Sequence, residues 1–416
     1  MKKKVFILLQ VLSVVFISSC KEDDRGQYPV DRTPPKKVDN ERVLKQFGGG
    51  VTIGYDIPDD KDLLYVKATY TLDTGTPMEI KSSLYETQMN IIGFSREGDH
   101  QVELRAVDRS QNESEPVYLD IRPLDSPIHA IFQSLSVFSD FGGVQLQWEN
   151  EEEFDITVMV SKPITAGSEL TESVVNFYSK AREGKNNVRG FPSREQEFLF
   201  QIQDRWGNTT DVLRDTYLPK YEEECNKARF LRWNGDPDIP YNQYSASWTI
   251  ENLWNSVYNA GASTGGFHTR TGSDPPATKI TFDLGAVYTL SRFKIWHRPT
   301  KDWVFTHGNP KKFTLYGSET PAARMEYDNS GNPEHAAFQW KKIGEFDTAK
   351  PSGLPVGENS DEDIQVAGVD GIDYTLPIET TVPVRYIRMD VLEMWGGTLD
   401  FLHMMEMSFW GEPKTE

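Results

Sequence analysis

Tryptophan is concentrated in the C-terminal half of the chain. Residues 225–416 hold eight of the ten tryptophans. An indole ring offers a flat apolar face for the C–H side of a sugar ring, and nearby polar groups can bond the sugar hydroxyls. Trp296, Trp340 and Trp410 lie where apolar and polar residues alternate, which predicts buried positions in strands. Trp254, Trp303 and Trp395 are candidates for ligand contact.

Catalytic motifs give no comparable signal. The sequence has no H-E-x-x-H metal motif, no phosphate-binding loop and no dinucleotide-binding glycine pattern. Counting does not decide whether a glycosidase carboxylate pair exists, because 63 residues are acidic. Small β-rich domains rarely supply the deep pocket that tunes such a pair. We therefore expect a protein without catalytic activity.

The charge and the cysteines narrow the choice of partners. The net charge of −19 repels phosphate backbones, so we expect no nucleic-acid partner, while neutral sugars and cations remain compatible. The acidity is equally explained as a means of staying in solution. Only two cysteines occur, Cys20 and Cys225, too few for a disulfide framework or a four-thiolate zinc site. We expect Cys225 to be a small buried apolar side chain.

The N-terminus has the form of an export signal. Residues 2–4 are lysines, residues 5–17 are mostly apolar, and the run is shorter than the roughly 20 residues that span a bilayer. The following Ile17-Ser18-Ser19-Cys20 resembles the bacterial lipobox, which implies that lipid is attached to Cys20 after removal of residues 1–20. An ordinary secretory signal with a chance cysteine is the alternative.

The residues after this cysteine extend the resemblance. Lys21-Glu22-Asp23-Asp24 resembles the surface-export signal of Bacteroidota lipoproteins, which implies anchoring in outer-membrane lipid with the chain exposed at the cell surface. The alternative is a solvated charged linker. We expect residues 21–34 to be a flexible linker.

An internal repeat predicts two similar β-sandwich domains. Asp-Arg-x-x-Asn occurs at residues 108–112 and again at residues 204–208, 96 residues apart. Each copy follows alternating apolar residues, as in a half-buried strand, and the Asp and Asn suit a turn. The segments Val51-Ile53-Tyr55, Val66-Ala68-Tyr70 and Val144-Leu146-Trp148 show the same alternation, which predicts further half-buried strands. We read the Asp-Arg-x-x-Asn element, and the acidic run at residues 149–153, as turns rather than sites. Residues 35–125 and 126–222 resemble fibronectin type III or immunoglobulin-like sandwiches.

The C-terminal segment, residues 225–416, resembles a third kind of domain. Six stretches match the strands of the discoidin, or coagulation factor 5/8 type C, family in order and spacing: residues 280–285, 290–296, 313–318, 340–344, 384–388 and 404–411. That resemblance implies an eight-stranded jelly roll. The whole chain is thus expected to be all-β, with two sandwiches followed by this discoidin-like domain.

The domain order resembles a class of Bacteroidota surface lipoproteins encoded beside nutrient-import systems. There, the discoidin-like domain is similar to carbohydrate-binding module family 32. The resemblance implies capture of a polysaccharide or glycan for an outer-membrane transporter, through loops at one end of the jelly roll. The loop residues that we expect to bind the glycan are Trp254, His268, Arg298, Trp303 and Trp395. Alternatively, Trp254 and Trp395 close the end of the core.

Many discoidin domains hold a structural calcium, and this chain matches that site only in part. Glu406 corresponds to the calcium-binding glutamate of the last strand. Asn255 stands near the expected aspartate, and a neutral amide is a weaker calcium ligand. The acidic residues 361–363 lack the glycine of an EF-hand loop, so we expect a solvated loop there.

Two other functions fit the same fold. Discoidin folds also bind proteins, so the domain could be an adhesion module that uses the same loops. The chain could also act only as an accessory that docks onto a transporter complex. Exposed tryptophan faces beside arginine and histidine favour a sugar, whereas a broad apolar patch would favour a protein.

Overall fold

The computed structural model describes residues 32–233, 243–258, 266–273, 278–320, 340–378 and 381–414. Cys20 and the predicted signal segment lie outside the described residues, as does most of the predicted linker. Strands make up 51% of the structure and helices 8%, which confirms the predicted all-β class. No helix among the described residues is long and apolar enough to cross a membrane.

The chain divides into two compact units. Of the described residues, the first unit contains those from 32 to 136, Gln147–Lys185 and Phe198–Arg214, and the second contains Val137–Leu146, Asn186–Glu197 and those from 215 to 414. The second unit therefore includes all of the described C-terminal domain.

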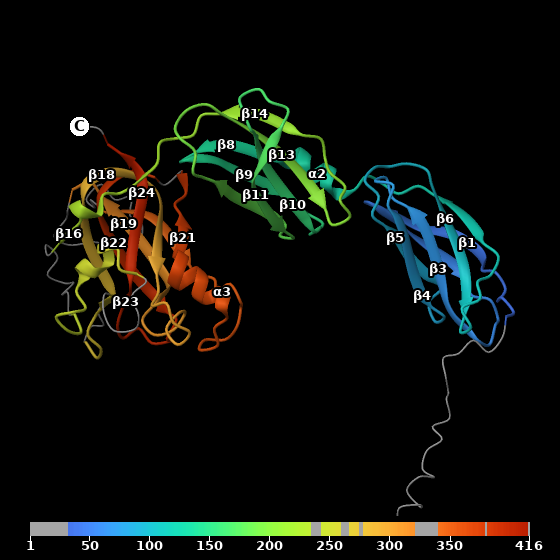
Figure 1. The fold of residues 1–416 in the computed structure, drawn as a ribbon. Coiled ribbons are helices and arrows are strands. Elements are labelled where there is room, and N and C mark those ends of the chain that lie inside the picture. Colours follow the sequence, from blue (N-terminus) through green and yellow to red (C-terminus); the bar gives the residue numbers. More distant parts are fainter. Residues whose placement is uncertain are drawn as a thin grey trace, which may run out of the picture. The chain divides into compact units, whose positions relative to one another are not determined.

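Two sheets facing each other form the first sandwich (Figure 1). One has the strand order β1-β2-β5 and the other β4-β3-β6-β7. The strands are β1 Asp39–Phe47, β2 Gly50–Asp56, β3 Leu63–Thr71, β4 Pro77–Ser83, β5 Gln88–Ile92, β6 His100–Asp108 and β7 Val117–Ile121. Alternate residues of β2 and β3 are buried in the shared core, as their period-two pattern predicted.

The next part of the chain has one short helix and two more sheets, of order β11-β10-β13-β14 and β12-β9-β8. Its elements are α2 Pro127–Ser134, β8 Ser136–Asp140, β9 Gly143–Glu149, β10 Ile156–Pro163, β11 Thr171–Ser179, β12 Glu183–Val188, β13 Gln196–Asp204 and β14 Leu213–Tyr217. In β9, Val144, Leu146 and Trp148 are buried, as their alternation predicted.

The repeated Asp-Arg-x-x-Asn element is a turn in both copies. Asp108 Oδ1 accepts the backbone N–H of Asn112 at 2.8 Å, and its Oδ2 accepts Asn112 Nδ2 at 2.8 Å. Asp204 and Asn208 form the same two bonds, at 3.0 and 2.8 Å. The predicted structural role of this element is confirmed, since both carboxylates are used up in closing their own loops.

An eight-stranded sheet forms most of the C-terminal domain, in the order β15-β24-β18-β22-β19-β20, with β16 and β21 each pairing with β18; β17 and β23 form a separate pair. The strands are β15 Glu223–Glu224, β16 Leu231–Arg232, β17 Phe267–His268, β18 Lys279–Trp296, β19 Pro310–Ser318, β20 Lys341–Asp347, β21 Ile372–Thr375, β22 Pro383–Met394, β23 His403–Met404 and β24 Glu406–Pro413. The described residues of this domain also include the short helical segments η1 Lys227–Arg229, η2 Ile250–Trp254, α3 Asp361–Ile364 and η3 Gln365–Asp370.

Strand β18 joins two stretches that the sequence predicted as separate strands. Its first part pairs with β22 and its second part pairs with β24. The register shifts between Asp283 and Tyr288, where Gly285 has a φ of 73° and lies so close to the Arg229 carbonyl that a Cβ would clash. The glycine lets one strand bend and serve both parts of the sheet.

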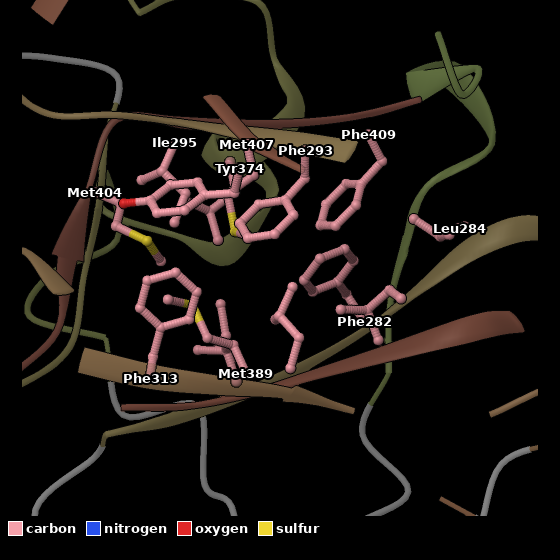
Figure 2. Close-up of a cluster of buried hydrophobic side chains, with 14 of the residues drawn as sticks. Phe282, Leu284, Phe293, Ile295, Phe313, Tyr374, Met389, Met404, Met407 and Phe409 are labelled. Carbon is pink, nitrogen blue, oxygen red and sulfur yellow. The ribbon is translucent and has the colours of Figure 1, made fainter. Parts of the chain in front are cut away.

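Aromatic and methionine side chains fill the core between these parts. Figure 2 shows Phe282, Phe293, Phe313, Tyr374 and Phe409 gathered in it. The Phe293 and Tyr374 rings stack with centroids 4.8 Å apart. Cys225 is also part of this core and is 1% exposed, which confirms its predicted burial. The tightly packed sheet is a rigid base for the loops that leave it.

Candidate functional site

The loop between β18 and β19 carries an aromatic and basic cluster. Trp303 is half-buried, and the guanidinium carbon of Arg298 lies 4.5 Å from the centroid of its ring. The exposed imidazole of His307 lies with its centroid 4.0 Å from that of Trp303. The structure therefore brings together two of the predicted site residues, Arg298 and Trp303, and adds His307.

Two buried asparagines hold this loop. The Asn309 side chain donates to the carbonyls of Trp303 and Thr306, both at 2.8 Å. The Asn359 side chain, from the segment before α3, donates to the carbonyls of Lys301 and Val304 at 2.6 and 3.0 Å. Four backbone carbonyls of the loop are thus fixed by two amide groups, which leaves little freedom in the position of the Trp303 ring.

The backbone of the loop is also strained. Phe305 and His307 have φ values of 48° and 53°, in the left-handed region that side chains with a Cβ disfavour. Phe305 is fully buried, so its packing can hold this conformation. Strain of this kind persists where surrounding structure enforces it and is frequent at ligand sites.

Trp395 lies beneath the loop rather than on its surface. It is 9% exposed and belongs to a small apolar cluster with Val304, Phe305 and Ala367. Its ring meets Phe305 edge-on, with centroids 5.1 Å apart. This geometry matches the alternative interpretation of Trp395 as a packing residue, which supports the loop from below.

The third predicted aromatic residue, Trp254, also packs inward. It lies at the end of η2, is partly buried against the main core, and has its centroid 5.5 Å from that of Phe282. Its other ring neighbour is Phe230, at 6.0 Å. As with Trp395, the structure favours the core-closing alternative.

His268 lies in a second group of aromatic rings that continues from the first. It stacks on Phe401 with centroids 4.5 Å apart and rings 4° from parallel, and Tyr244, which is 60% exposed, lies 5.0 Å from it. Phe401 in turn lies 6.5 Å from His307. Arg298, Trp303, His307, Phe401 and His268 therefore form one continuous band, which we call the loop-end surface.

Hydrogen bonds fix the tautomers of both histidines in this surface. The single Thr306 hydroxyl hydrogen goes to the Asp302 carbonyl at 3.1 Å, so His307 Nδ1–H donates to Thr306 Oγ1 at 2.9 Å. His268 Nδ1–H donates to the Thr269 carbonyl at 2.5 Å. In each ring Nε2 is left with a lone pair, so both imidazoles can accept a hydrogen bond there.

The imidazoles of the site are neutral at neutral pH. Burial lowers the pKa of His268 and of His307, and the nearby Arg298 lowers the pKa of His307 further. Burial also lowers the pKa of His297, beneath the loop, to about 3, and lowers that of His403 well below its usual value. The permanent positive charge of the cluster is therefore the Arg298 guanidinium.

The two predicted calcium ligands do not meet as a cation site. The Glu406 carboxylate is fully buried and is bonded by the Lys227 ammonium at 2.6 Å and by the backbone N–H of Ser256 at 3.1 and 3.2 Å. The Asn255 side-chain oxygen instead accepts the Val257 N–H at 2.8 Å. Calcium needs six to eight oxygen ligands, whereas hydrogen-bond donors surround this carboxylate, so the residues present do not fit the ion.

In the part of the chain that is described, no cluster of three or more His, Cys, Asp or Glu could hold a metal ion. Asp363 is not solvated as the sequence suggested: it is buried and caps α3 in a capping box with Ser360. Residues 261–265 have the spacing G-x-S-x-G, but they lie outside the described residues.

Several residues in or next to the loop-end surface were not singled out by sequence. Phe401 and Tyr244 come from segments with no repeated pattern, and Asn309 and Asn359 look like ordinary loop residues. Only their contacts in the folded chain identify them. His307 follows Trp303 by four residues, but no sequence feature placed it against the indole ring.

Three domain families match successive parts of the chain. Residues 35–123 match the domain of unknown function DUF4959, residues 124–228 match DUF5126, and residues 254–411 match DUF5000, also of unknown function. No curated protein sequence matches the chain.

Some solved structures are similar to parts of the chain. A SusE-like protein is 25% identical, with 68% of this chain and 98% of that chain covered and a TM-score of 0.41. The family 89 glycoside hydrolase from Clostridium perfringens is 16% identical, covers 41% of this chain and 13% of its own, and has a TM-score of 0.25. Two fibronectin type III domains of chicken tenascin are 14% identical, cover 44% of this chain and 99% of their own, and have a TM-score of 0.20. These TM-scores are too low to transfer a function.

Proposed function

We propose that the protein is a non-catalytic glycan-binding protein of the cell surface, which holds a sugar ring at the loop-end surface. The observation that carries this proposal is the half-buried Trp303 ring with Arg298 and His307 packed against it, at 4.5 and 4.0 Å. An aromatic ring with hydrogen-bond donors and acceptors beside it offers the kinds of group that bind a pyranose.

The chemistry of the surface suits a sugar with many hydroxyls. Trp303 supplies an apolar face for the C–H side of the ring. The Arg298 guanidinium supplies several hydrogen-bond donors in a fixed fork, while Nε2 of His307 and of His268 can accept from hydroxyls. Donors and acceptors are therefore both present, as the alternating roles of sugar hydroxyls demand.

The loop is held in position before any ligand arrives. Asn309 and Asn359 fix its carbonyls, and Phe305 fixes it to the apolar cluster beneath. A site that is already ordered loses less conformational entropy on binding, which favours affinity for a small flat ligand.

A binding role fits the electrostatics better than glycoside hydrolysis does. Hydrolysis uses two carboxylates with contrasting pKa values on either side of the bond to be broken. The pKa values of His268, His307 and Arg298 are shifted by burial, a backbone carbonyl and each other, with no described carboxylate among the causes. The loop-end surface thus has the character of a recognition site.

Anchoring and partners form the second part of the proposal. The lipobox-like sequence before Cys20 and the acidic residues after it support a lipid-anchored chain on the outer face of an outer membrane. A glycan-binding protein in that place would deliver its ligand to a transporter complex. Loss of labelled fatty acid from a Cys20→Ser variant, and a pulldown that recovers a membrane partner, would test these two points separately.

The decisive experiment for the glycan site is affinity electrophoresis of residues 21–416 through a panel of polysaccharides, followed by calorimetry with any that retard the protein. A sugar face that covers roughly 50–100 Å² of indole gains about 1–3 kcal/mol, so Trp303→Ala should weaken binding about tenfold or more. The matched control is Tyr178→Ala, which removes an aromatic ring that is 79% exposed on β11.

Equal binding by the Trp303→Ala and control variants would place the site elsewhere. If correctly folded protein is retarded by no polysaccharide of a broad panel, the proposal of a glycan ligand fails. A protein ligand for the same loops would then be the next hypothesis to test.

A further inference from the structure

The carboxylate of Glu406 is buried and therefore requires a positively charged partner. Glu406 begins β24, pairs with Trp296 of β18, and is 0% exposed. An ionised carboxylate that is removed from water costs several kcal/mol unless a cation and hydrogen bonds compensate it. The partner that the structure supplies belongs to the chain itself.

That partner is the Lys227 ammonium, which reaches Glu406 from a segment 179 residues away. Its Nζ lies 2.6 Å from Glu406 Oε1 and 3.4 Å from an oxygen of Glu224, and its side chain is 15% exposed. The Asn226 side chain accepts the N–H of Ala228 and so caps the η1 turn that holds Lys227 in place. The lysine thus connects the first turn of the domain to its last strand.

A third segment converges on the same carboxylate. Ser256, just after η2, donates its backbone N–H to both oxygens of Glu406, and it does so from a φ of 63°. Three segments far apart in the sequence therefore meet at one carboxylate, through one ammonium and one amide. A calcium ion bound between loop carbonyls and a glutamate would connect the same kind of segments.

We propose that Lys227 takes the place of a structural metal ion in this domain, so that the C-terminal domain folds and holds its loops without calcium. The Lys227 ammonium supplies positive charge where a divalent cation would otherwise supply it to Glu406. It offsets only part of the effect of burial, which raises the pKa of this carboxyl to about 7. The Ser256 N–H donates to both oxygens of the same carboxylate, and a hydrogen-bond donor in that position suits an anion and is no ligand for calcium.

The first test is thermal unfolding of the chain from residue 21 onward, in chelator and in millimolar calcium, together with the calcium content of the purified protein. We expect equal melting temperatures and no bound calcium. A melting temperature that rises with calcium and falls with chelator, or calcium that remains bound after purification, would overturn the proposal.

The second test removes the ammonium. Lys227→Met keeps the apolar stem but leaves the buried carboxylate without its cation, so the melting temperature should fall by about 10 °C. The matched control is Lys294→Met. Both lysines lie near the Trp296 ring, with the ammonium of Lys227 at 6.0 Å and that of Lys294 at 5.8 Å from its centroid. The Lys294 ammonium, however, donates to the carbonyl of Asp370 in an exposed position, so its loss should have little effect.

The double variant Lys227→Met/Glu406→Gln separates charge from packing. Removal of both charges should restore part of the lost stability, because no uncompensated ion remains. An Lys227→Met variant no less stable than the Lys294→Met control would refute the proposal. If Lys227→Met does not fold, the proposal is tested with Lys227→Arg, which keeps the cation and should therefore fold without calcium. The calcium titration of the unmodified chain is the second measurement in that case.

Discussion

Trp395→Ala should destabilise the C-terminal domain, and it should weaken glycan binding only through that loss. Trp395 is 9% exposed and packs edge-on against Phe305 beneath the Trp303 loop. Truncation of a buried tryptophan costs about 3–5 kcal/mol, and the small residual exposure places this residue near the lower value. For a domain of this size, that corresponds to a fall in melting temperature of roughly 6–12 °C.

Trp303→Ala should give the opposite pattern. Its ring is half-buried on the loop-end surface, so its truncation removes less packing and should lower the melting temperature by no more than about 3 °C. Binding should nevertheless fall about tenfold or more, as estimated from the indole area that a sugar covers. A comparison of the two variants therefore distinguishes a tryptophan that supports the loop from one that contacts the ligand.

The assay is thermal unfolding of both variants by circular dichroism, with binding measured by calorimetry well below the lower melting temperature. Trp395→Phe is the control, since a smaller ring should restore part of the packing. If Trp395→Ala abolishes binding while the melting temperature is unchanged, Trp395 contacts the ligand directly. The reasoning from burial would then be wrong.

Two further predictions concern stability. Burial lowers the pKa of His297 to about 3 and that of His403 well below 6.5, so the unfolded chain binds more protons than the folded chain below pH 6.5. The free energy of unfolding should therefore fall by up to about 1.4 kcal/mol per pH unit for each imidazole as the pH drops below that value. Urea unfolding at pH 7.5 and 5.5 checks this, and a pH-dependent difference in the wild type no larger than that in His297→Asn would contradict it. Glu222→Ala should lower the free energy of unfolding by about 3 kcal/mol, because the Glu222 carboxylate is 8% exposed and its removal takes a buried ionic partner from the Arg292 guanidinium. Asp373→Ala removes an exposed partner of the same arginine and should lower it by less than about 1 kcal/mol. Equal losses of stability in urea unfolding would show that burial does not set the difference.

The sequence was most informative where a short-range pattern fixes the structure. Period-two alternation in Val51-Ile53-Tyr55 and Val66-Ala68-Tyr70 correctly predicted which side chains enter the core, because a strand turns successive residues to opposite faces. The Asp-Arg-x-x-Asn turn was equally predictable, since its bonds join residues only four apart. These features depend on neighbours in the chain.

Such local patterns do not predict contacts between residues that are far apart in the sequence. The pairing of Lys227 with Glu406 joins residues 179 apart, and the bond from Asn359 to Lys301 joins residues 58 apart. No local rule says which of many lysines and asparagines will be buried. The same limit explains Trp395, whose sequence surroundings look like a loop although its ring packs inward.

Burial also explains why the loop-end surface can be both strained and stable. Positive φ values at Phe305 and His307 each cost free energy, which the apolar cluster below and the amides of Asn309 and Asn359 offset. A loop so constrained cannot adapt its shape to many ligands. The surface should therefore select for a sugar whose face and hydroxyls already match, with affinity set by the fit to Trp303 rather than by loop closure.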